Sequence, residues 1–489
     1  MKKALLAALG IALLAYPAAS WYLGIRVESV LDDHYRQLES MAYVTVSERH
    51  YERGVFGATE SVTLEIFGEL MKGLGGGASP RTPLLLTLRS RIRHGPFAGG
   101  SLAVAAMHSE LRLDPEVQAE VDRLTGGASL LSGRAVFQLD GSGTGRLSSP
   151  AFSTERPDPE TGETLRLVWG GIRSEVAFAA QMQHYSMSGS LPRLEMTNDE
   201  GVGMVMLGMR FSADQQRLLA DDPLLYAGPQ HFAVEQIRIV AEGDAELALE
   251  RLRYDVDTPT RGDFVDLIAR TRVEAIETEG RVYGPASCDF SIRHLHARTL
   301  AGLYRRLLDV YADPPQTDGG GDAHADAYAN GDTDTADTLQ PLALVAEPAL
   351  ELLGHQPTVH LDRLSVATAE GELLLEAHAS LPGIQPGAFG NPALLLAGLD
   401  ARARIAVPKA LLIRLATERA GTQLAAMSDT GVLTETDIQT LAAQLEVKLA
   451  QLIDQGLIQR DGDALISEIT LEAGQLRVNG EPFDPNAIQ

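Results

Sequence analysis

Apolar and polar residues alternate along most of the chain between about residue 43 and residue 295. Val62, Leu64 and Ile66, for example, are separated by Thr63 and Glu65. This two-residue period is typical of a β-strand with one buried and one solvated face. Further runs of the same kind are Leu84–His94, Arg134–Leu139, Leu165–Val168, Glu175–Gln183, Glu195–Asn198, Phe232–Ala241 and Arg272–Tyr283. Many short strands with little helix between them predict an antiparallel sheet system rather than βαβ units.

A helical period replaces this alternation after residue 298. Segments with one apolar helical face lie at 300–311, 342–353, 409–427 and 436–455. Gly456 is the expected stop of the last helix, and a hairpin over residues 464–478 follows it. We therefore predict an α+β fold: a large curved antiparallel β-sheet body with packed helices, plus one N-terminal transmembrane helix.

The transmembrane prediction rests on the first 26 residues. Lys2 and Lys3 precede 22 uncharged residues, Ala4–Ile25, and Arg26 closes the run. As a helix this run is roughly 33 Å long, enough to cross a hydrocarbon core of about 30 Å. Trp21 and Tyr22 stand at its far end, where aromatic residues favour the membrane–water interface. The lysine pair predicts a single pass with the rest of the chain outside the cytoplasm.

A cleaved signal peptide is the alternative for the same residues. Its apolar region would end near Tyr16, and Ala18, Ala19 and Ser20 supply small residues before a cut. The apolar run continues past that point, which favours a retained anchor over residues 1–26. Under either interpretation the body is exported.

Four further segments follow the anchor. Helical spacing continues over residues 27–42 and predicts an amphipathic stalk, before a β-rich body at 43–312. Residues 313–338 contain seven aspartates and no Lys or Arg. They offer too few apolar groups to offset the entropy of ordering, so we expect an acidic disordered linker there. Residues 339–489 form a C-terminal α+β part.

Charge and cysteine content narrow the possible functions. The 489 residues include 41 basic and 66 acidic ones, a net charge of −25. Neutralising phosphates requires clustered Lys and Arg, so this is not the composition of a nucleic-acid binder. The one cysteine, Cys288, excludes an intrachain disulfide and a Cys-rich zinc site. We expect Cys288 to be a small buried residue, or else a partner in an intermolecular disulfide.

Two side-chain patterns are candidate sites, each with an ordinary structural explanation beside it. Arg89, Arg91 and Arg93 alternate on one face of a predicted strand and form a possible ladder for a lipid phosphate or an acidic partner; the alternative is a solvated sheet face. His294 and His296 share a strand face but lack an evident third metal ligand. The sequence contains no Gly-x-Ser-x-Gly elbow, His-Glu-x-x-His motif or P-loop, so it nominates no catalytic residue, metal or cofactor.

Several separated segments resemble the YdgA-like family of bacterial envelope proteins, a domain of unknown function (number 945). The segments that carry this resemblance are Lys2-Lys3 with the apolar run ending at Trp21, Tyr22 and Gly24; Tyr51, Arg53, Gly54 and Phe56; His94, Gly95, Pro96 and Phe97; Leu399–Pro408; and Gly474–Gly480, which includes Asn479. The acidic 313–338 stretch departs from the family pattern.

The resemblance implies a protein of the Gram-negative inner membrane that faces the periplasm, with no assigned reaction; a homodimer is one assembly that it allows. It supplies no catalytic residues. We expect structural roles for the motif residues, with turns at Gly54 and Gly95-Pro96, and with Phe56 and Phe97 as core plugs beneath those turns.

Three functions are compatible with these observations. The first is a membrane-anchored periplasmic protein that accommodates phospholipid on an apolar sheet face, in a groove like that of AsmA-like proteins, and helps to maintain the envelope or transport its components. The second is a non-catalytic scaffold that binds another envelope protein. The third is a periplasmic enzyme of unknown reaction.

Overall fold

The computed structural model describes residues 2–39, 44–66, 84–98, 102–113, 115–157, 164–241, 246–312, 347–382, 394, 397–427 and 435–483. The chain divides into two compact units. Unit 1 comprises Met1–Phe232 and Ala297–Ala349, and unit 2 comprises Ala233–His296 and Leu350–Gln489. The predicted acidic linker at 313–338 lies outside the described residues.

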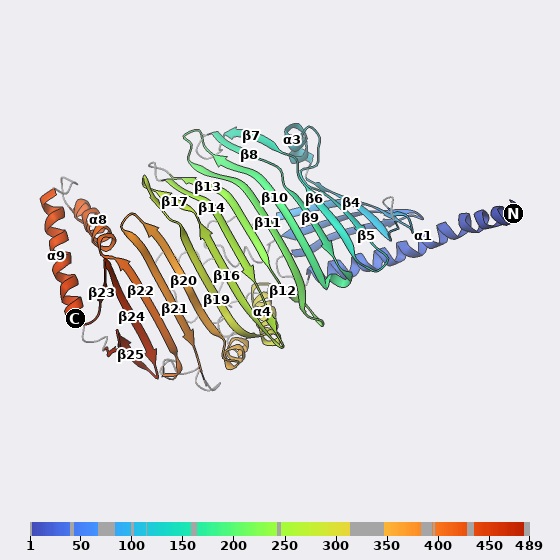
Figure 1. Ribbon diagram of the computed structural model, residues 1–489. Helices are drawn as coiled ribbons and strands as arrows, with labels where there is room; N and C mark the ends of the chain where they lie inside the picture. Colours follow the sequence, from blue (N-terminus) through green and yellow to red (C-terminus); the bar gives the residue numbers. More distant parts are fainter. Residues whose placement is uncertain are drawn as a thin grey trace, which may run out of the picture. The chain divides into compact units, whose positions relative to one another are not determined.

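Unit 1 contains an antiparallel sheet in which neighbours in space are mostly neighbours in sequence (Figure 1). Its strands, in hydrogen-bonded order, are β1 (Val44–Arg53), β2 (Gly57–Ile66), β3 (Leu84–His94), β4 (Ala105–Arg112), β5 (Ser132–Phe137), β6 (Gly143–Ser148), β9 (Arg173–Phe178), β10 (His184–Thr197), β11 (Gly203–Leu219) and β12 (Asp222–Ala227). The hairpin of β7 (Phe152–Pro157) and β8 (Thr164–Trp169) joins β10 beyond the end of β9. The described residues of this unit include the helices α1 (Lys2–Glu39), α3 (Pro115–Thr125) and α4 (Ala297–Ala312), and a 3-10 turn at Ala180–Met182.

Unit 2 is also built on antiparallel pairing. Its strands, in hydrogen-bonded order, are β14 (Glu246–Asp257), β16 (Phe264–Val273), β19 (Ala286–His296), β20 (Thr358–Thr368), β21 (Gly371–Ser380), β22 (Asp400–Pro408), β24 (Ala464–Glu472), β25 (Gln475–Val478) and β26 (Glu481–Pro482). The strand β17 (Ala275–Thr278) continues β16 along the same edge of β14. Short strands β15 (Thr260–Arg261), β18 (Arg281–Tyr283) and β23 (Gln459–Asp461) pair with β16, β17 and β24. The helices α8 (Lys409–Met427) and α9 (Glu435–Asp454) follow β22, and β13 (Gln230–Val240) crosses the boundary between the units.

The α+β class and the antiparallel, β-rich body agree with the prediction from the sequence. The strand β3, the helix α8 and the hairpin β24–β25 begin and end at the predicted residues. Gly456, with φ of +74°, follows the end of α9 and lets the chain turn back into strands. The helix α3 and the 17-residue length of β11 were not predicted from the pattern.

The division into units differs from the predicted boundary at 313–338. The reason is a strand pairing: β19, which precedes that segment, pairs along its length with β20, which follows it. The chain therefore adds strands to an existing sheet after residue 338 instead of starting a separate part. Such long-range pairing leaves no mark on the local hydrophobic period.

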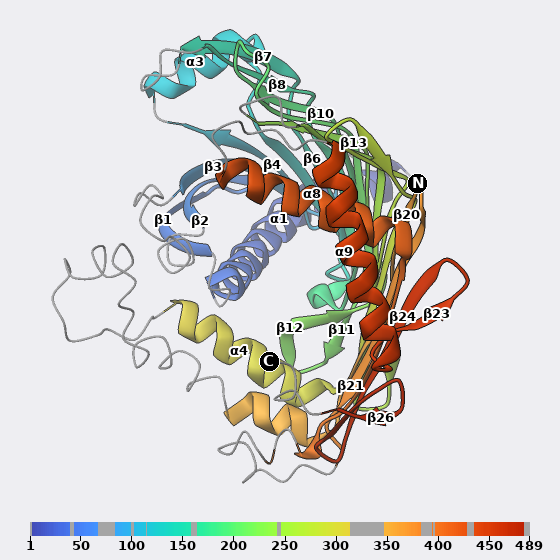
Figure 2. The ribbon, with the colours of Figure 1, turned by 90° about the vertical axis from the view of Figure 1, so that its left-hand side faces the viewer.

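The helix α1 runs without interruption from Lys2 to Glu39, so the predicted anchor and stalk are one helix despite Pro17. Its second half crosses one face of β1–β4 (Figures 1 and 2). Within the part of the chain whose side chains are described, no helix is long and apolar enough to span a membrane. The side chains of residues 1–15, and with them much of the predicted anchor, lie outside that part.

Candidate functional site

The residues that carry the family resemblance meet where α1 lies on the sheet. Val27 and Leu31 on α1 pack against Ala58, Ile92 and Ala105 from β2, β3 and β4, and all five are buried. The alternation of the strands places these residues on one face, and the spacing of four on α1 places its apolar pair opposite them. This contact is the best-buried apolar cluster of unit 1 and fixes the position of α1 along the strands.

His94, at the end of β3, locks the contact with α1. Its Nδ1–H donates to the backbone carbonyl of Ser20 (2.9 Å), while the Ser20 hydroxyl donates to the carbonyl of His94 (2.8 Å). Gly24, one turn further along α1, has no side chain to obstruct the imidazole, since a Cβ there would lie 2.7 Å from His94 Cε1. Ser20 and His94 are both buried. His94 is therefore a docking residue for the helix in this structure.

The turns on either side of this lock come from the family motifs. Gly54 donates its N–H to the carbonyl of Gly57 (2.8 Å), which closes the β1–β2 turn, and Gly95 has a φ of +138° that favours glycine. The predicted turns are thus confirmed. The prediction of core plugs is wrong: Phe56 and Phe97 are 53% and 63% exposed. They stand at the tips of turns, beyond the strand ends, and not in the core beneath them.

Arg53 and Tyr51 of β1 contact the same helix. The Arg53 guanidinium pairs with Glu28 of α1 (2.6 Å) and lies over the ring of Trp21, 4.7 Å from its centroid. Tyr51 packs against the buried cluster. Burial, and then the charges of Glu28 and Glu60, raises the pKa of Tyr51 to about 12. Both motif residues therefore hold α1, in keeping with a structural role.

A buried carboxylate lies further along the same contact. The side chain of Glu60 on β2 is fully buried; it accepts hydrogen bonds from Arg49 Nε (2.7 Å) and from the Tyr35 hydroxyl (3.0 Å). Arg49 also pairs with Asp32 of α1 and lies over the ring of Tyr35. Burial, and then the charge of Glu60, raises the pKa of Tyr35 above its ordinary value. The group is a polar lock between helix and sheet, because a buried charge is tolerated only with such partners.

Past α1, the same face of the sheet continues as an apolar strip. The cross-strand register aligns Ile92 of β3 with a row of residues on successive strands, namely Met107, Ala135, Gly145, Val176, Met187 and Ala213. Directly opposed residues of an antiparallel sheet share a face. We call the part of this face formed by Ala135, Phe137, Val176, Phe178, Met187 and Phe211 the apolar floor.

Glycines let the aromatic rings of the apolar floor lie along the sheet. Gly143 stands between Phe137 and Phe178 in the register, and a Cβ there would come within 2.4 Å of the Phe178 ring. Gly189 likewise leaves its space to Phe211, with a distance of 2.3 Å to the ring. At these two positions the ring of the neighbouring strand occupies the space that a side chain would fill.

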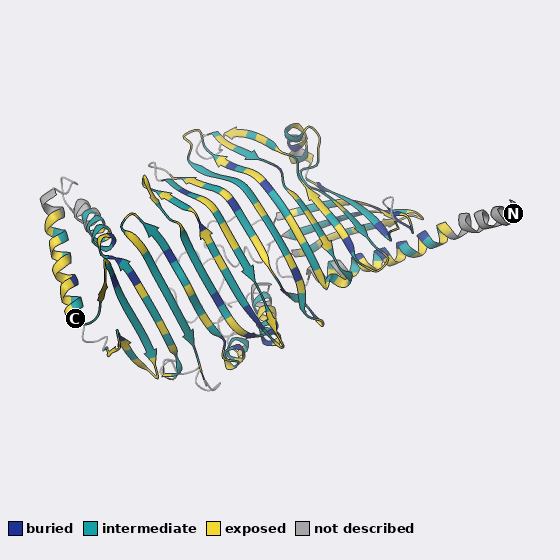
Figure 3. Ribbon diagram, viewed as in Figure 1, coloured by how far each residue is buried: buried dark blue, intermediate teal, exposed yellow. Residues whose placement is uncertain are grey.

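The apolar floor becomes more exposed with distance from α1. Ile92, beneath the helix, is 3% exposed, whereas Met187, five strands further along the row, is 36% exposed. Figure 3 shows these strands mostly as intermediate and exposed. On the far side, Tyr226 of β12 packs edge-on against Tyr185, with ring centroids 5.1 Å apart. The floor is thus bounded by α1 and by β12, with partly exposed apolar side chains between them.

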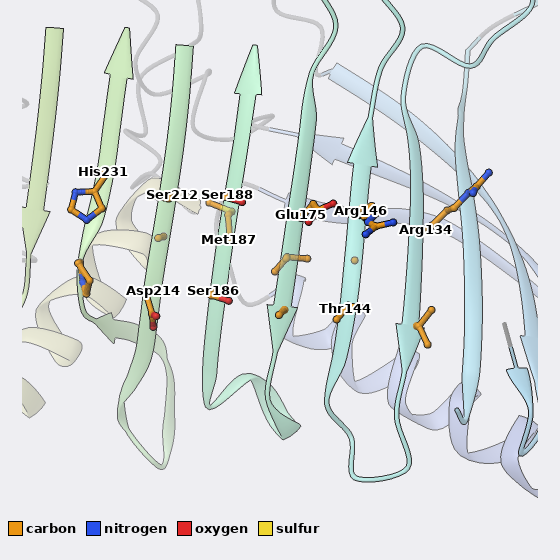
Figure 4. Close-up of a pocket in the computed structure, with 16 residues that line it drawn as sticks. Arg134, Thr144, Arg146, Glu175, Ser186, Met187, Ser188, Ser212, Asp214 and His231 are labelled. Atoms are coloured by element: carbon orange, nitrogen blue, oxygen red, sulfur yellow. Dashed lines mark ion pairs between the residues drawn. The ribbon is translucent and has the colours of Figure 1, made fainter. Parts of the chain in front are cut away.

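The opposite face of these strands is polar. It carries a hollow of about 850 Å³ lined by residues that include Arg134, Arg146, Glu175, Ser188 and Asp214. Figure 4 labels these residues together with Met187 of the apolar floor, which also contributes to the lining, and α1 passes behind the strands. Arg146 pairs with Glu175 (2.9 Å), and all the charged groups named are exposed. Exposed charges on an open surface, of which one pair is shown to neutralise each other, are typical of a solvated sheet face.

The arginine ladder also lies on that polar side. Arg89, Arg91 and Arg93 are all exposed, whereas the intervening Ser90 and Ile92 are buried on the α1 side. Their shared face confirms the predicted alternation. The ladder is nevertheless on the opposite side of the sheet from the apolar floor, so the structure does not bring it to acyl chains on that floor. Arg89 stands opposite Glu110 in the register, as on an ordinary mixed-charge face.

The remaining candidates from the sequence, His294, His296 and Cys288, lie in unit 2, where His294 and His296 are packed against other rings. Phe264 stacks on His294, with centroids 3.9 Å apart, and His296 stacks on His355 at 4.1 Å. Among the described residues, no group of three His, Cys, Asp or Glu side chains is arranged to hold a metal ion. Cys288 is half-buried within β19.

Asn479 and Gly480 close the C-terminal hairpin of unit 2. Asn479 accepts from the N–H of Glu468 (2.9 Å) and donates to the carbonyl of Gly456 (2.7 Å), so it ties the end of α9 to the sheet. Gly480 has a φ of +87°, as the turn requires. Both are structural residues.

Neither Arg49 nor Glu60 was singled out from the sequence, and Ser20 and Gly24 were named there without a predicted contact with His94. The sequence nevertheless contains a pattern that could have indicated each of the two pairs, Ser20 with Gly24 and Arg49 with Glu60. Ser20 and Gly24 are small residues four apart, which is the spacing that lets another backbone approach a helix. Arg49 and Glu60 are charges at positions where the strand period predicts inward side chains.

These features define a class: an α+β protein in which a long N-terminal helix is clamped onto an antiparallel sheet whose apolar face extends beyond it. The chain belongs to the family described as "Bacterial protein of unknown function (DUF945)", whose model matches residues 1–486. No curated protein and no solved structure matches the chain.

Proposed function

We propose that this chain is a single-pass protein of the bacterial inner membrane whose body, in the periplasm, binds phospholipid acyl chains on the apolar floor. One observation carries the proposal: the row that begins at buried Ile92 continues to Met187 with increasing exposure. A row of apolar side chains left in contact with water is unfavourable by roughly 25 cal/mol per Å², so a surface of this kind favours an apolar ligand.

The membrane anchor is part of the same proposal. It rests on the uncharged run at residues 4–25, which lies within α1. Because α1 borders the apolar floor, an anchor at its N-terminal end would hold the floor beside the bilayer. An acyl chain leaving the leaflet would then find an apolar surface close by, which is the physical requirement for a role in maintaining or transporting envelope lipids.

Lipid binding on the apolar floor can be tested with two adjacent residues that lie on opposite faces of β10. A benzophenone amino acid is placed at Met187, on the apolar floor, or at Ser188, on the polar face, in the full chain expressed in a Gram-negative host. After irradiation and purification, phospholipid adducts are sought by mass spectrometry. We expect adducts at position 187 and none at 188.

Other outcomes separate the alternatives. A protein adduct at 187 in place of lipid would favour the scaffold. Equal lipid labelling at 187 and 188 would mean that lipid contacts the sheet without using the floor, and the proposal would fail.

A further inference from the structure

Exposed apolar side chains gather at the end of unit 1 that receives α1. Phe56 on the β1–β2 turn and Phe97 just after β3 are more than half exposed, and Leu102, two residues before Val104, is 60% exposed. Gly95 donates its N–H to the carbonyl of Val104 (3.0 Å), which holds Phe97 and Leu102 on neighbouring segments. Two turns that both present large apolar groups to solvent are unusual in a soluble domain and mark an interaction surface.

The contacts of these turns with α1 show which residues of the helix lie beside them. The ring of Phe56 stacks on Tyr16, with centroids 6.0 Å apart. His94 holds Ser20, and a Cβ at Gly95 would lie 3.4 Å from the Tyr16 hydroxyl. The turns therefore lie beside residues 16–20 of the helix, which belong to its uncharged run.

Helix length then constrains where the bilayer begins. Tyr16 precedes Ile25 by nine residues, so it lies about 13 Å along the helix from the end of the run. If all of residues 4–25 were within hydrocarbon, the turns and their polar backbone would be about that deep in the membrane, which is strongly unfavourable. Residues 4–20 alone are about 25 Å long, close to the shortest span that crosses a bilayer.

We propose that the two turns enter the membrane interface, with Phe56, Phe97 and Leu102 among the lipid headgroups of the leaflet that faces the body. This inference rests on the membrane anchoring proposed above and adds a second attachment to it. Aromatic and apolar tips are the side chains that favour this zone. With α1 clamped by His94 and Arg53, a helix and two turns touching one leaflet fix the tilt of unit 1 as well as its distance.

Tryptophan reporters test this placement in the full chain. The chain has two tryptophans, Trp21 and Trp169. Trp169→Phe leaves Trp21 as the reporter of the helix. In the W21F/W169F background, Phe97→Trp reports the turn, and Val117→Trp reports an exposed apolar site on α3, which follows the opposite end of β4. Each variant is reconstituted in vesicles of equal phosphatidylcholine and phosphatidylglycerol, with and without bromine on the upper part of the acyl chains.

We expect the bromines to remove most of the emission from position 97, about as much as from Trp21, and to leave position 117 unchanged. Quenching of Trp21 without quenching at 97 would overturn the inference and leave the anchor intact. If Trp21 is also unaffected, the anchor fails and the inference fails with it. Equal quenching at 97 and 117 would indicate general adsorption of the body and would also contradict the inference.

Discussion

Glu60 shows how a single charged residue can determine the helix–sheet contact. Its fully buried carboxylate is satisfied by Arg49 and Tyr35, and Arg49 also pairs with Asp32 of α1. Breaking such a pair by removing one partner leaves an uncompensated buried charge, which is more unfavourable than the loss of a surface ion pair. The stability of the contact therefore depends on Arg49 more than on any exposed ion pair of β1.

Arg49→Met should lower the free energy of unfolding by about 3–5 kcal/mol, because Glu60 then stays buried without its cation. Denaturant unfolding of the full chain in detergent, followed by circular dichroism, measures this. The matched control on the same strand is His50→Gln, which removes an exposed pair with Glu52 and should leave the midpoint nearly unchanged. If both variants lost similar amounts of unfolding free energy, the carboxylate of Glu60 would have to be accessible to water.

Two helical glycines of unit 1 give a second residue-scale prediction. Gly24→Ala puts a methyl group against the His94 ring, so we expect the free energy of unfolding to fall by about 1–3 kcal/mol. Gly302→Ala on α4 meets nothing within 4 Å and should stabilise the protein by up to about 1 kcal/mol, as alanine favours helix. The same unfolding measurement serves for both. If the two variants shifted in the same direction, the close approach of α1 to His94 would be refuted.

At the scale of elements, β20 and β21 carry a pair of facing histidines in unit 2. His360 and His378 are opposed in the register, with ring centroids 4.5 Å apart, and the Thr358 hydroxyl lies 2.9 Å from His360 Nε2. Burial first, and then the neighbouring His378 and Arg293, lower the pKa of His360 below its ordinary value. His360 therefore binds a proton more weakly in the folded protein than in the unfolded chain.

This difference predicts a loss of stability in mild acid. The contribution of His360 is fully present above the unfolded pKa of about 6.5, and it is lost as the pH falls from there through the lower, folded pKa. We expect a lower denaturant midpoint at pH 5 than at pH 7.5, with part of that difference absent in His360→Gln. If His360→Gln showed the same pH dependence as the wild type, His360 would be excluded as a cause of the loss of stability in acid.

The helices and strands also show which features the local hydrophobic pattern can predict. The β3 strand was predictable because it has one buried face and a clear two-residue period. The helix α3 was not predicted, although Val117, Val121 and Leu124 give its 11 residues an apolar stripe at helical spacing. The contact of His94 with Ser20 and Gly24 was not predictable, since His94 is 74 residues from Ser20 in sequence and only the packing of α1 brings them together.

At the scale of the whole molecule, the proposed topology places all but the first residues outside the cytoplasm. Alkaline phosphatase, which is active only where disulfides form, should be active when fused after Gln489 and inactive when the anchor is removed. Replacing Lys2 and Lys3 by Glu should reduce that activity, because the positive residues orient the helix. A fusion that is inactive although the protein is present in the membrane would contradict the orientation.

The sequence by itself determined the class of fold, the presence of a long uncharged N-terminal segment, the absence of an intrachain disulfide and the family. Each of these depends on composition or on a local period. Tertiary structure alone decided that Phe56 and Phe97 are exposed, that Arg89–Arg93 and the apolar floor are on opposite faces, and that strands on either side of residues 313–338 pair directly. These properties depend on contacts between segments that are distant in sequence, and a local hydrophobic period does not record such contacts.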